Sequence, residues 1–340
     1  MGRSHAIQYQ RHDRTDVVAV ADLDGDARSE LADEFDVPGT YEDHTAMLAD
    51  GGLDVVSICT WHSTHAEIAI SAAEAGIDGI ICEKPMATSL GESRDMLDAA
   101  DRNDAKLAVS TQRRFDPVHE TARDLIANGA IGTPRAVTAQ KGGGLLNWGT
   151  HIVDITRYIL GDPDYEWVMG QVERRTDRYE RGLEVEDRCV GQICFEGGAR
   201  MTYEGDMPGP DFDDVTIHFS GSDGVLELDL GSSITVVTES GTEEHTPSSD
   251  MSDRSAFLAA FVEWLDGDRE DHRCSGPRAG VVVEVLMALY ESARTGGVVE
   301  APLHTRANPL KQMIETGDLP VEYPGRYDIR LPHGSVRDDE

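Results

Sequence analysis

Short apolar runs alternate with helical patterns in the first third of the chain, and this alternation constrains the fold most. Nearly continuous apolar runs fall at residues 17–21, 54–59, 79–82 and 107–110. Helical patterns follow the first three of these runs, at residues 27–35, 65–75 and 90–102. Apolar strands joined through helices are typical of a parallel sheet with helices on both faces. The sequence therefore predicts an α/β domain with a Rossmann-type, doubly wound parallel sheet, which we place at residues 1–116.

The pattern changes after Pro117, where strands begin to follow one another directly. Helical segments are expected at residues 119–128, 148–160 and 281–293. Strands are expected at 136–140, 168–175, 188–195, 199–204, 215–220, 225–230 and 234–238. The turn Glu196-Gly197-Gly198 is typical of a hairpin, and Phe257, Phe261 and Leu265 form one apolar helical stripe. Residues 117–340 are therefore predicted to form an α+β domain on a large, mostly antiparallel sheet.

The charge of the chain is strongly acidic, with 64 Asp and Glu against 30 Lys and Arg, a formal net charge of −34. The acids are spread along the predicted helices and loops and do not form a tail. At molar salt the Debye length falls to about 3 Å, so self-repulsion largely disappears. We interpret the composition as adaptation to a salty, halophilic cytosol; an ordinary acidic protein is the alternative. Nucleic acid and anionic membranes are poor partners for such a surface.

The cysteines and the apolar segments indicate a cytoplasmic protein. The five cysteines are scattered and odd in number, which argues against a disulfide framework and for a reducing compartment. No apolar stretch reaches the length of a membrane span, and the printed chain does not open on a secretory signal.

The end of the first strand carries a candidate for cofactor binding. Dinucleotide-binding folds place an acid about 20 residues after a glycine-rich turn, on the ribose hydroxyls. Asp22 ends the first run and lies 20 residues after Gly2, which would be the last glycine of that turn. The charge of Asp22 would disfavour a 2′-phosphate, which predicts NAD over NADP. A turn residue at a strand end is the alternative role for Asp22.

Polar residues also follow the second and third strands, at the edge where such sheets bind ligands. Cys59, His62 and His65 look like a metal cluster, but zinc needs three or four converging ligands. We therefore interpret this segment as a ligand-binding loop and predict no metal. Glu83-Lys84-Pro85 ends the third strand, and Lys84 is one of only four lysines. Because burial can shift the pKa of a lysine, Lys84 is a functional candidate; a surface Glu–Lys pair is the alternative.

A glycine run at residues 142–144 leads into the helix expected at 148–160. Asn147, His151 and Asp154 are spaced to share one helical face. Their apolar neighbours predict a largely buried helix, and buried polar groups need partners. A ligand cleft is therefore one interpretation of this face, and a solvated surface is the other.

Together these segments resemble the glucose–fructose oxidoreductase and inositol dehydrogenase (Gfo/Idh/MocA) family. The matching segments are residues 17–22, 60–65, 72–76, 83–85 and 114–117, the glycine run with His151 and Asp154, and residues 290–293. The resemblance implies an NAD-dependent dehydrogenase that acts on a hydroxyl-bearing carbon of a sugar, sugar derivative or inositol. It also implies a homo-oligomer, a dimer or tetramer. An NAD-dependent glycosidase of the same fold and a non-catalytic sugar or nucleotide sensor are the alternatives.

The resemblance also implies roles for individual residues. Lys84 and His151 would flank the substrate carbon, with His151 as general base and Lys84 stabilising the developing alkoxide, although either could be the formal base. The chain has Asn147 where many relatives have Asp, and Trp61 where proline is common. The implied cofactor contacts are Gly2, Asp22, Thr60, Trp61, His65, Glu83 and Lys84. The implied substrate contacts are Arg114, Lys141 and Asp154, beside the catalytic Lys84, His151 and Asn147.

The helix that begins near Gly2 should follow a strand in this fold. In the strand order 3-2-1-4-5-6, the first strand is central and leads into the glycine-rich turn. The printed chain has neither that strand nor the two leading glycines. We therefore expect an upstream extension of about ten residues that ends in a Gly-x-Gly turn, and the loss of that segment could inactivate the chain.

Overall fold

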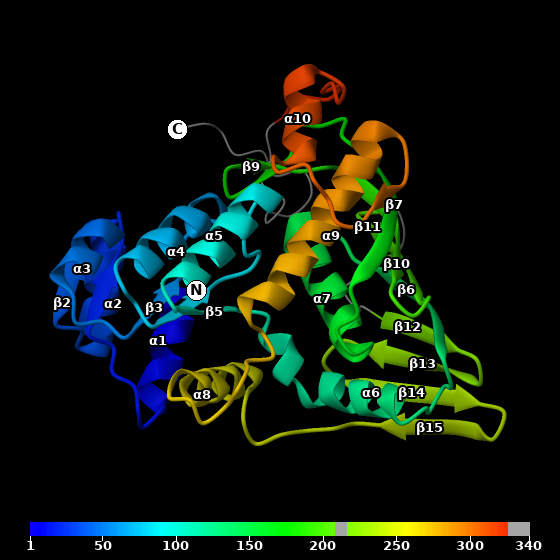
Figure 1. The fold of residues 1–340 in the computed structure, drawn as a ribbon, viewed down its shortest axis with the longest axis horizontal. Helices are drawn as coiled ribbons and strands as arrows, with labels where there is room; N and C mark the ends of the chain where they lie inside the picture. The colour runs from blue at the N-terminus through cyan, green and yellow to red at the C-terminus, as the bar shows by residue number, and fades with distance from the viewer. Residues whose placement is uncertain (208–215, 326–340) are drawn as a thin grey trace. The chain divides into compact units, whose positions relative to one another are not determined.

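The computed structural model describes residues 1–207 and 216–325 (Figure 1). The chain divides into two compact units. The first unit comprises residues 1–87, 92–112 and 251–279, and the second comprises residues 88–91, 113–250 and 280–340. The division predicted from the sequence, between residues 116 and 117, assigns residues 251–279 to the second domain. They pack with the first unit instead, because the apolar stripe of Phe257 and Phe261 is buried there.

The strands of the first unit form two parallel sheets. One sheet pairs β1 (Ala19–Ala21) with β2 (Gly39–Tyr41). The other has the order β3 (Val55–Ile58), β4 (Gly79–Cys82) and β5 (Lys106–Val109). The parallel Rossmann-like arrangement predicted from the apolar runs is therefore confirmed, with β2 as an addition. Among the described residues no ladder joins the two sheets, and the strand expected upstream of Met1 stays a prediction.

Helices connect these strands, and acidic side chains start several of them. They are α1 (Gly2–Arg11), α2 (Gly25–Phe35), α3 (His44–Asp50), α4 (His65–Glu74), α5 (Leu90–Arg102) and α8 (Asp253–Leu265). The Asp24 carboxylate caps α2 by accepting from the backbone N–H groups of Asp26 and Ala27, and Asp43 caps α3 in the same way. Such caps satisfy N–H groups that have no partner inside the helix. Part of the acidic composition thus has a local structural role.

One sheet of nine strands dominates the second unit, in the order β15-β14-β13-β12-β6-β11-β10-β7-β16. The strands are β6 (Pro134–Gln140), β7 (Tyr165–Glu173), β10 (Arg188–Phe195), β11 (Arg200–Gly205), β12 (Thr216–Gly221), β13 (Gly224–Asp229), β14 (Ser233–Thr238), β15 (Gly241–His245) and β16 (Val299–Glu300). Every neighbouring pair is antiparallel except β6 with β11. The prediction of a large, mostly antiparallel sheet is therefore confirmed.

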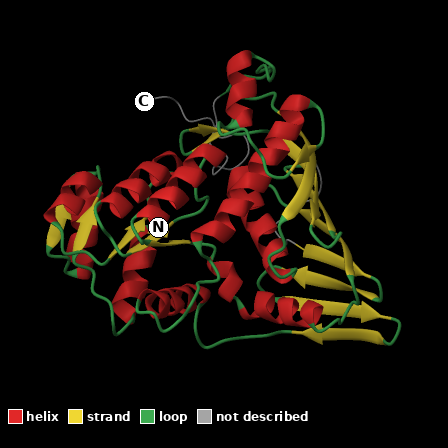
Figure 2. Ribbon diagram, in the orientation of Figure 1, coloured by secondary structure: helices red, strands yellow, loops and turns green. Residues whose placement is uncertain are grey.

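The helices of the second unit are drawn in red beside this sheet in Figure 2. They are α6 (Pro117–Ala127), α7 (Thr150–Ile159), α9 (Gly276–Thr295), which starts in the first unit, and α10 (Pro309–Thr316). On β12, Ile217 and Phe219 are 0% exposed, whereas the alternate residues are partly exposed. This alternation is typical of a sheet that buries one face. Within the described ranges, no helix has both the length and the apolar character that crossing a membrane requires.

The predicted hairpin at Glu196-Gly197-Gly198 joins β10 to β11, with Ile193 opposite Met201. Gly197 and Gly198 have φ angles of 84° and 86°, a left-handed conformation that glycine adopts at little cost. The elements absent from the sequence prediction are short or mostly polar: α3, α10, β2, β15, β16 and the pair β8 (Tyr179–Glu180) and β9 (Leu183–Glu184).

Candidate active site

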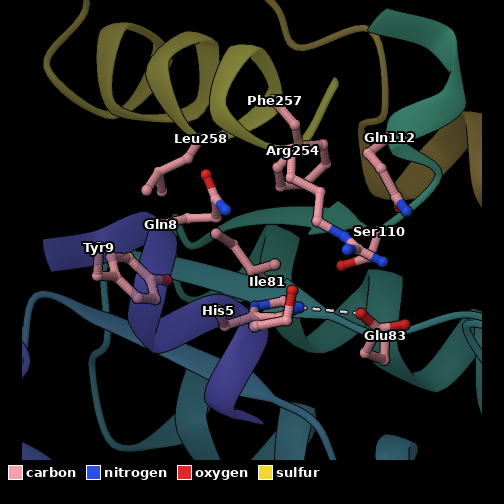
Figure 3. A pocket seen from close by; sticks show the side chains of 11 residues that line it. His5, Gln8, Tyr9, Ile81, Glu83, Ser110, Gln112, Arg254, Phe257 and Leu258 are labelled. Atoms are coloured by element: carbon pink, nitrogen blue, oxygen red, sulfur yellow. Dashed lines mark hydrogen bonds and ion pairs between the residues drawn. The ribbon is translucent and has the colours of Figure 1, made fainter. Parts of the chain in front are cut away.

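The carboxyl end of β4 and the adjoining strand β3 carry polar residues of the first unit, and α1 packs beside them. His5, on α1, contacts both strands: its Nδ1 lies 3.2 Å from Ser57 Oγ, and its Nε2 lies 2.9 Å from Glu83 Oε1 (Figure 3). The Tyr9 hydroxyl, one turn further along α1, lies 2.7 Å from the same Ser57 oxygen. Glu83 is among the residues predicted from the sequence, but His5 and Tyr9 are not. His5 and Tyr9 lie four residues apart and therefore share one face of α1, which could have pointed to them. A helix whose polar face is exposed to solvent shows the same spacing, however.

His5 and Glu83 form an ion pair at neutral pH. Burial alone lowers the pKa of His5, but hydrogen bonds to Cys59 and Glu83 outweigh it and raise the pKa to about 9. Burial also raises the pKa of Glu83, but the hydrogen bond and charge of His5 outweigh it, so this pKa is lowered. The two side chains are only 13% and 10% exposed. The pair is therefore screened little by salt.

Lys84 follows Glu83, and hydrogen bonds hold the backbone before and after it. Glu83 Oε2 accepts a 3.3 Å hydrogen bond from the backbone N–H of Lys84. On the other side, His65 Nδ1 lies 2.9 Å from Pro85 O, and His65 Nε2 lies 3.3 Å from Thr60 O. His65 is 0% exposed, so it anchors the backbone behind the strand end. The predicted contact of His65 with the cofactor stays a prediction.

The loop after β3 presents Thr60 and Trp61 to solvent, and Trp61 is 55% exposed. The Thr64 hydroxyl donates to the Trp61 carbonyl at 2.9 Å, which fixes the turn. The rings of His62 and His65 meet edge to face with centroids 5.8 Å apart. Within the described residues, no group of three His, Cys, Asp or Glu side chains is arranged to hold a metal ion.

The carboxyl end of β1 carries Asp22, the predicted ribose ligand. Asp22 Oδ1 accepts a 2.9 Å hydrogen bond from the backbone N–H of Asp24, which is the turn role that the sequence left as an alternative. The Arg28 guanidinium donates to the backbone carbonyl of Asp22 at 2.6 Å. Because the turn uses one carboxylate oxygen, the exposed side chain of Asp22 can still accept a ribose hydroxyl through the other.

The start of α1 also fits a dinucleotide. Gly2 is the first residue of α1, and the N-cap residue Met1 makes no side-chain capping bond. A Cβ on Gly2 would come no closer than 3.6 Å to a neighbouring atom, Leu31 Cδ1. An uncapped helix N-terminus attracts phosphate oxygens. The residues present at the ends of α1, β1 and β4 therefore suit a nicotinamide dinucleotide.

A small cavity of about 30 Å³ opens beside this cluster in the first unit (Figure 3). It is lined by residues of α1, of the strand ends and of α8: Ser4, His5, Gln8, Tyr9, Ile81, Glu83, Ser110, Gln112, Arg254, Phe257 and Leu258. Ser110 is 5% exposed, and its hydroxyl has no hydrogen-bond partner among the described residues. The cavity has a mostly apolar wall with a few polar groups and is large enough for a water molecule, which could hydrogen-bond to Ser110 or Glu83.

In the second unit, the glycine run leads into a π-helical turn, η3 (Gly144–Gly149), and then into α7. Gly143 has φ of 100°, and a Cβ there would lie 2.6 Å from Trp148 Cδ1, so only glycine fits. The sequence predicted an α-helical face from Asn147 onwards. That spacing is wrong locally, because the backbone N–H of Thr150 reaches back five residues to Leu145 O. Such π turns are frequent at functional sites.

His151 is the second residue of α7 and is 9% exposed. The Trp148 ring meets the His151 ring with centroids 5.5 Å apart. Lys141 Nζ lies 4.6 Å and Arg113 Cζ 5.5 Å from the Trp148 ring centroid. The structure thus gathers His151 and Lys141 around one indole, with Asn147 on the same π turn and partly exposed.

Arg114 and Asp154 form a buried ion pair with each other. The Arg114 Nε and Nη2 atoms donate to the Asp154 carboxylate at 2.7–3.0 Å, and the side chains are 0% and 2% exposed. Arg114 Nη1 also binds Asp162 at 2.8 Å. These contacts tie α7 to η2 (Gln112–Phe115). Both side chains thus have a structural role, and their predicted contact with substrate stays a prediction.

Sequence profiles of one oxidoreductase family match most of this chain. The profile described as an NAD-binding Rossmann fold matches residues 1–111, and that of the family's C-terminal alpha/beta domain matches residues 133–301. The chain belongs to the Gfo/Idh/MocA oxidoreductase family. The predicted resemblance is thereby confirmed, and the protein is an oxidoreductase with a nicotinamide cofactor.

Relatives in the Gfo/Idh/MocA family include characterised dehydrogenases. The chain is 27% identical over 323 residues to D-xylose 1-dehydrogenase (NADP(+)) 2 of Haloferax volcanii, covering 87% of this chain and 94% of that protein. It is 26% identical over 251 residues to myo-inositol 2-dehydrogenase of Thermotoga maritima, covering 70% and 75%. A levoglucosan dehydrogenase in complex with NADH and levoglucosan has the same fold, with TM-score 0.78, 22% identity and coverage of 89% and 97%.

The predicted Gfo/Idh/MocA site residues are divided between the two units. Gly2, Asp22, Thr60, Trp61, Glu83 and Lys84 belong to the first unit, and Lys141, Asn147 and His151 belong to the second. Within each unit the structure brings the predicted residues onto neighbouring segments. The meeting of Lys84 with His151 across one substrate stays a prediction.

Proposed function

We propose that the protein is an NAD-dependent dehydrogenase that oxidises a hydroxyl-bearing carbon of a sugar, sugar derivative or inositol. The observation that carries the proposal is the presence of both candidate groups in an oxidoreductase of this family. Lys84 is held at the carboxyl end of β4, and His151 is presented by the glycine-run turn. A sensor would need neither group.

The proposed roles follow from the chemistry of each side chain. When bound, nicotinamide supplies the hydride acceptor. The His151 imidazole takes the hydroxyl proton while the hydride leaves the same carbon. The Lys84 ammonium donates a hydrogen bond to the substrate oxygen and stabilises the negative charge that develops there. Asn147 orients a neighbouring hydroxyl, and the cations Lys141 and Arg113 beside Trp148 line the substrate side.

The choice between NAD and NADP depends on the end of β1. The exposed carboxylate of Asp22 would repel a 2′-phosphate, which supports NAD. Arg28 lies beside the same backbone, and the Haloferax relative is named for NADP. We expect kcat/KM to be higher with NAD than with NADP. We expect Asp22→Ala to bring the two values closer together. An equal or NADP-favouring ratio in the unaltered protein would mean that Asp22 does not contact the ribose.

The acidic surface supports a protein of a salty cytoplasm, and the open sheet face of the second unit would suit a dimer or tetramer. The function is tested by absorbance of reduced nicotinamide across D-xylose, other aldoses, sugar acids and myo-inositol, in molar KCl. Net formation of NADH with at least one of them is expected. An NAD-dependent glycosidase would cleave a glycoside without net NADH, and that result would contradict the dehydrogenase.

A further inference from the structure

Carboxylates, not other backbone groups, hold the glycine run of the second unit. Asp206 Oδ1 accepts from the backbone N–H of Gly143 and Asp206 Oδ2 from that of Gly144, each at 2.9 Å. Glu186 Oε1 accepts from the next N–H, that of Leu145, at 2.6 Å. Three consecutive amides are thus bound by two side chains that lie 41 residues or more away in sequence. Local turn chemistry does not require this arrangement.

Other side chains fix both carboxylates. The Tyr290 hydroxyl, on α9, donates to Glu186 Oε2 at 2.6 Å, and Glu186 and Tyr290 are each 0% exposed. Arg178 Nη2 donates to Asp206 Oδ1 at 3.3 Å. The carboxylates therefore have fixed positions, and they pass these positions on to the amides that they bind.

The bound amides directly precede the proposed catalytic groups. Leu145 accepts through its carbonyl from the N–H of Thr150 across the π turn, and His151 is the next residue. Asn147 lies inside the same turn. A displacement of Leu145 is therefore transmitted to His151 through one backbone hydrogen bond.

We propose that Glu186 and Asp206 are positioning residues for the reaction, which fix the turn Gly143–Leu145 and so set where Asn147 and His151 meet the substrate. The inference rests on the proposed function of His151. Neither carboxylate touches the substrate in this scheme. Their effect comes from geometry, and a displacement of about 1 Å in a reacting group can reduce turnover about 10²-fold.

Three variants separate positioning from the mere presence of a charge. Glu186→Gln keeps both contacts, because its amide oxygen accepts from Leu145 and its NH2 donates to the Tyr290 oxygen. Glu186→Ala loses both contacts. Asp206→Asn keeps only one acceptor for the amides of Gly143 and Gly144. Asn is preferred to Ala there because Asp206 has φ of 56°, a conformation that Asn tolerates better.

Glu284→Ala is the matched control. Glu284 Oε1 also accepts from one tyrosine hydroxyl, that of Tyr165, and from one backbone N–H, that of Leu303, each at 2.9 Å. It lies in the same unit but does not bind the glycine run. Any effect that comes only from losing a carboxylate that binds one tyrosine hydroxyl and one backbone N–H should therefore also appear in Glu284→Ala.

Two measurements on the full chain test the proposal: amide hydrogen exchange over residues 142–151, and kcat and KM with NAD and the best sugar of the panel. In Glu186→Ala and Asp206→Asn we expect exchange about 10-fold faster or more and kcat about 10- to 100-fold lower, with KM for NAD nearly unchanged. Glu186→Gln should restore both values, and Glu284→Ala should change neither.

Three outcomes would overturn the proposal: unchanged exchange in Glu186→Ala, faster exchange with unaltered kcat, or equal effects in Glu284→Ala. If the unaltered protein oxidises no sugar, the proposed function is wrong. The exchange measurement then still decides by itself whether the two carboxylates hold the turn.

Discussion

Two buried glutamates lie beside the two proposed catalytic groups, and their environments are electrostatic opposites. Glu83, next to Lys84, is paired with the imidazolium of His5, and its pKa is lowered. Glu186, behind the turn that leads to His151, binds a phenol and a backbone amide. Its burial, together with the charge of Asp206, raises its pKa.

The two glutamates differ in the partners that accompany their burial. A buried charge is tolerated when an opposite charge and hydrogen bonds accompany it, and His5 gives Glu83 both. The hydrogen-bond partners of Glu186 among the described residues are neutral, and its burial raises its pKa. In a chain with a net charge of −34, the first unit gives Glu83 an internal cation, whereas in the second the cation Arg178 binds Asp206 and Glu186 has neutral hydrogen-bond partners.

The largest expected effect comes from removing the groups that these glutamates support. Lys84→Ala and His151→Ala should each lower kcat by about 10²- to 10⁴-fold, because each loses a proton-transfer group or a donor to the developing charge. NAD affinity, measured by fluorescence titration, should change little. Lys311→Ala, an exposed lysine paired with Glu315, is the control. Turnover equal to that of the unaltered protein in either variant would contradict the assigned roles.

An intermediate effect is expected at His5. Its pKa is raised from 6.5 to about 9, so its contribution to the free energy of unfolding is complete below pH 6.5 and is lost as pH rises through 9. The shift corresponds to roughly 3 kcal/mol. Denaturant unfolding in molar KCl should therefore show His5→Gln much less stable than the unaltered protein at pH 6, with the gap narrowing towards pH 10.

The exposed His304 provides the comparison for this measurement. His304→Gln should leave stability almost unchanged at both pH values. A gap for His5→Gln that is independent of pH would mean that His5 is not a cation in the folded protein.

The smallest effect, of opposite sign, is expected at Glu186. Because its pKa is raised, the folded state prefers the protonated acid, and its stability falls as pH rises above the ordinary carboxyl range. Glu186→Gln keeps the hydrogen bonds and cannot ionise, so its stability relative to the unaltered protein should rise as pH rises above the ordinary carboxyl range. Denaturant unfolding at several pH values measures this. A relative loss over that range would show Glu186 to be a stabilising anion, like Glu83.

The sequence predicted the elements whose burial is simple and missed contacts between distant segments. The apolar run that becomes β4 and the helix α5 have the predicted bounds, because continuous burial and helical periodicity leave direct traces in a sequence. Lys84 was predicted as a functional residue because it follows the end of β4 closely. The ion pair between Arg114 and Asp154 was not predicted, because the spacing of Asp154 on a helix does not reveal a partner 40 residues earlier.

The π turn and the carboxylates that hold it were equally hidden. The glycine run indicated an unusual backbone, but nothing near it in sequence pointed to Glu186 or Asp206. His5 lay on a predicted helix, and its raised pKa depends on Glu83, 78 residues later. In each case the sequence shows the residue type but does not show which distant residue it binds.

Helix α8 has a consequence for how the protein is made. Its residues Phe257 and Leu258 line the cavity beside His5, and Val109 at the end of β5 donates from its N–H to Cys274 O at 2.9 Å. The nucleotide-binding half therefore closes only after the ribosome has passed residue 279, with eight of the nine strands of the large sheet emerging in between. Closing a loop this long slows folding, and the unfinished half exposes apolar surface to chaperones during synthesis. A fragment cut at the profile boundary, residue 111, would remain in that unfinished state.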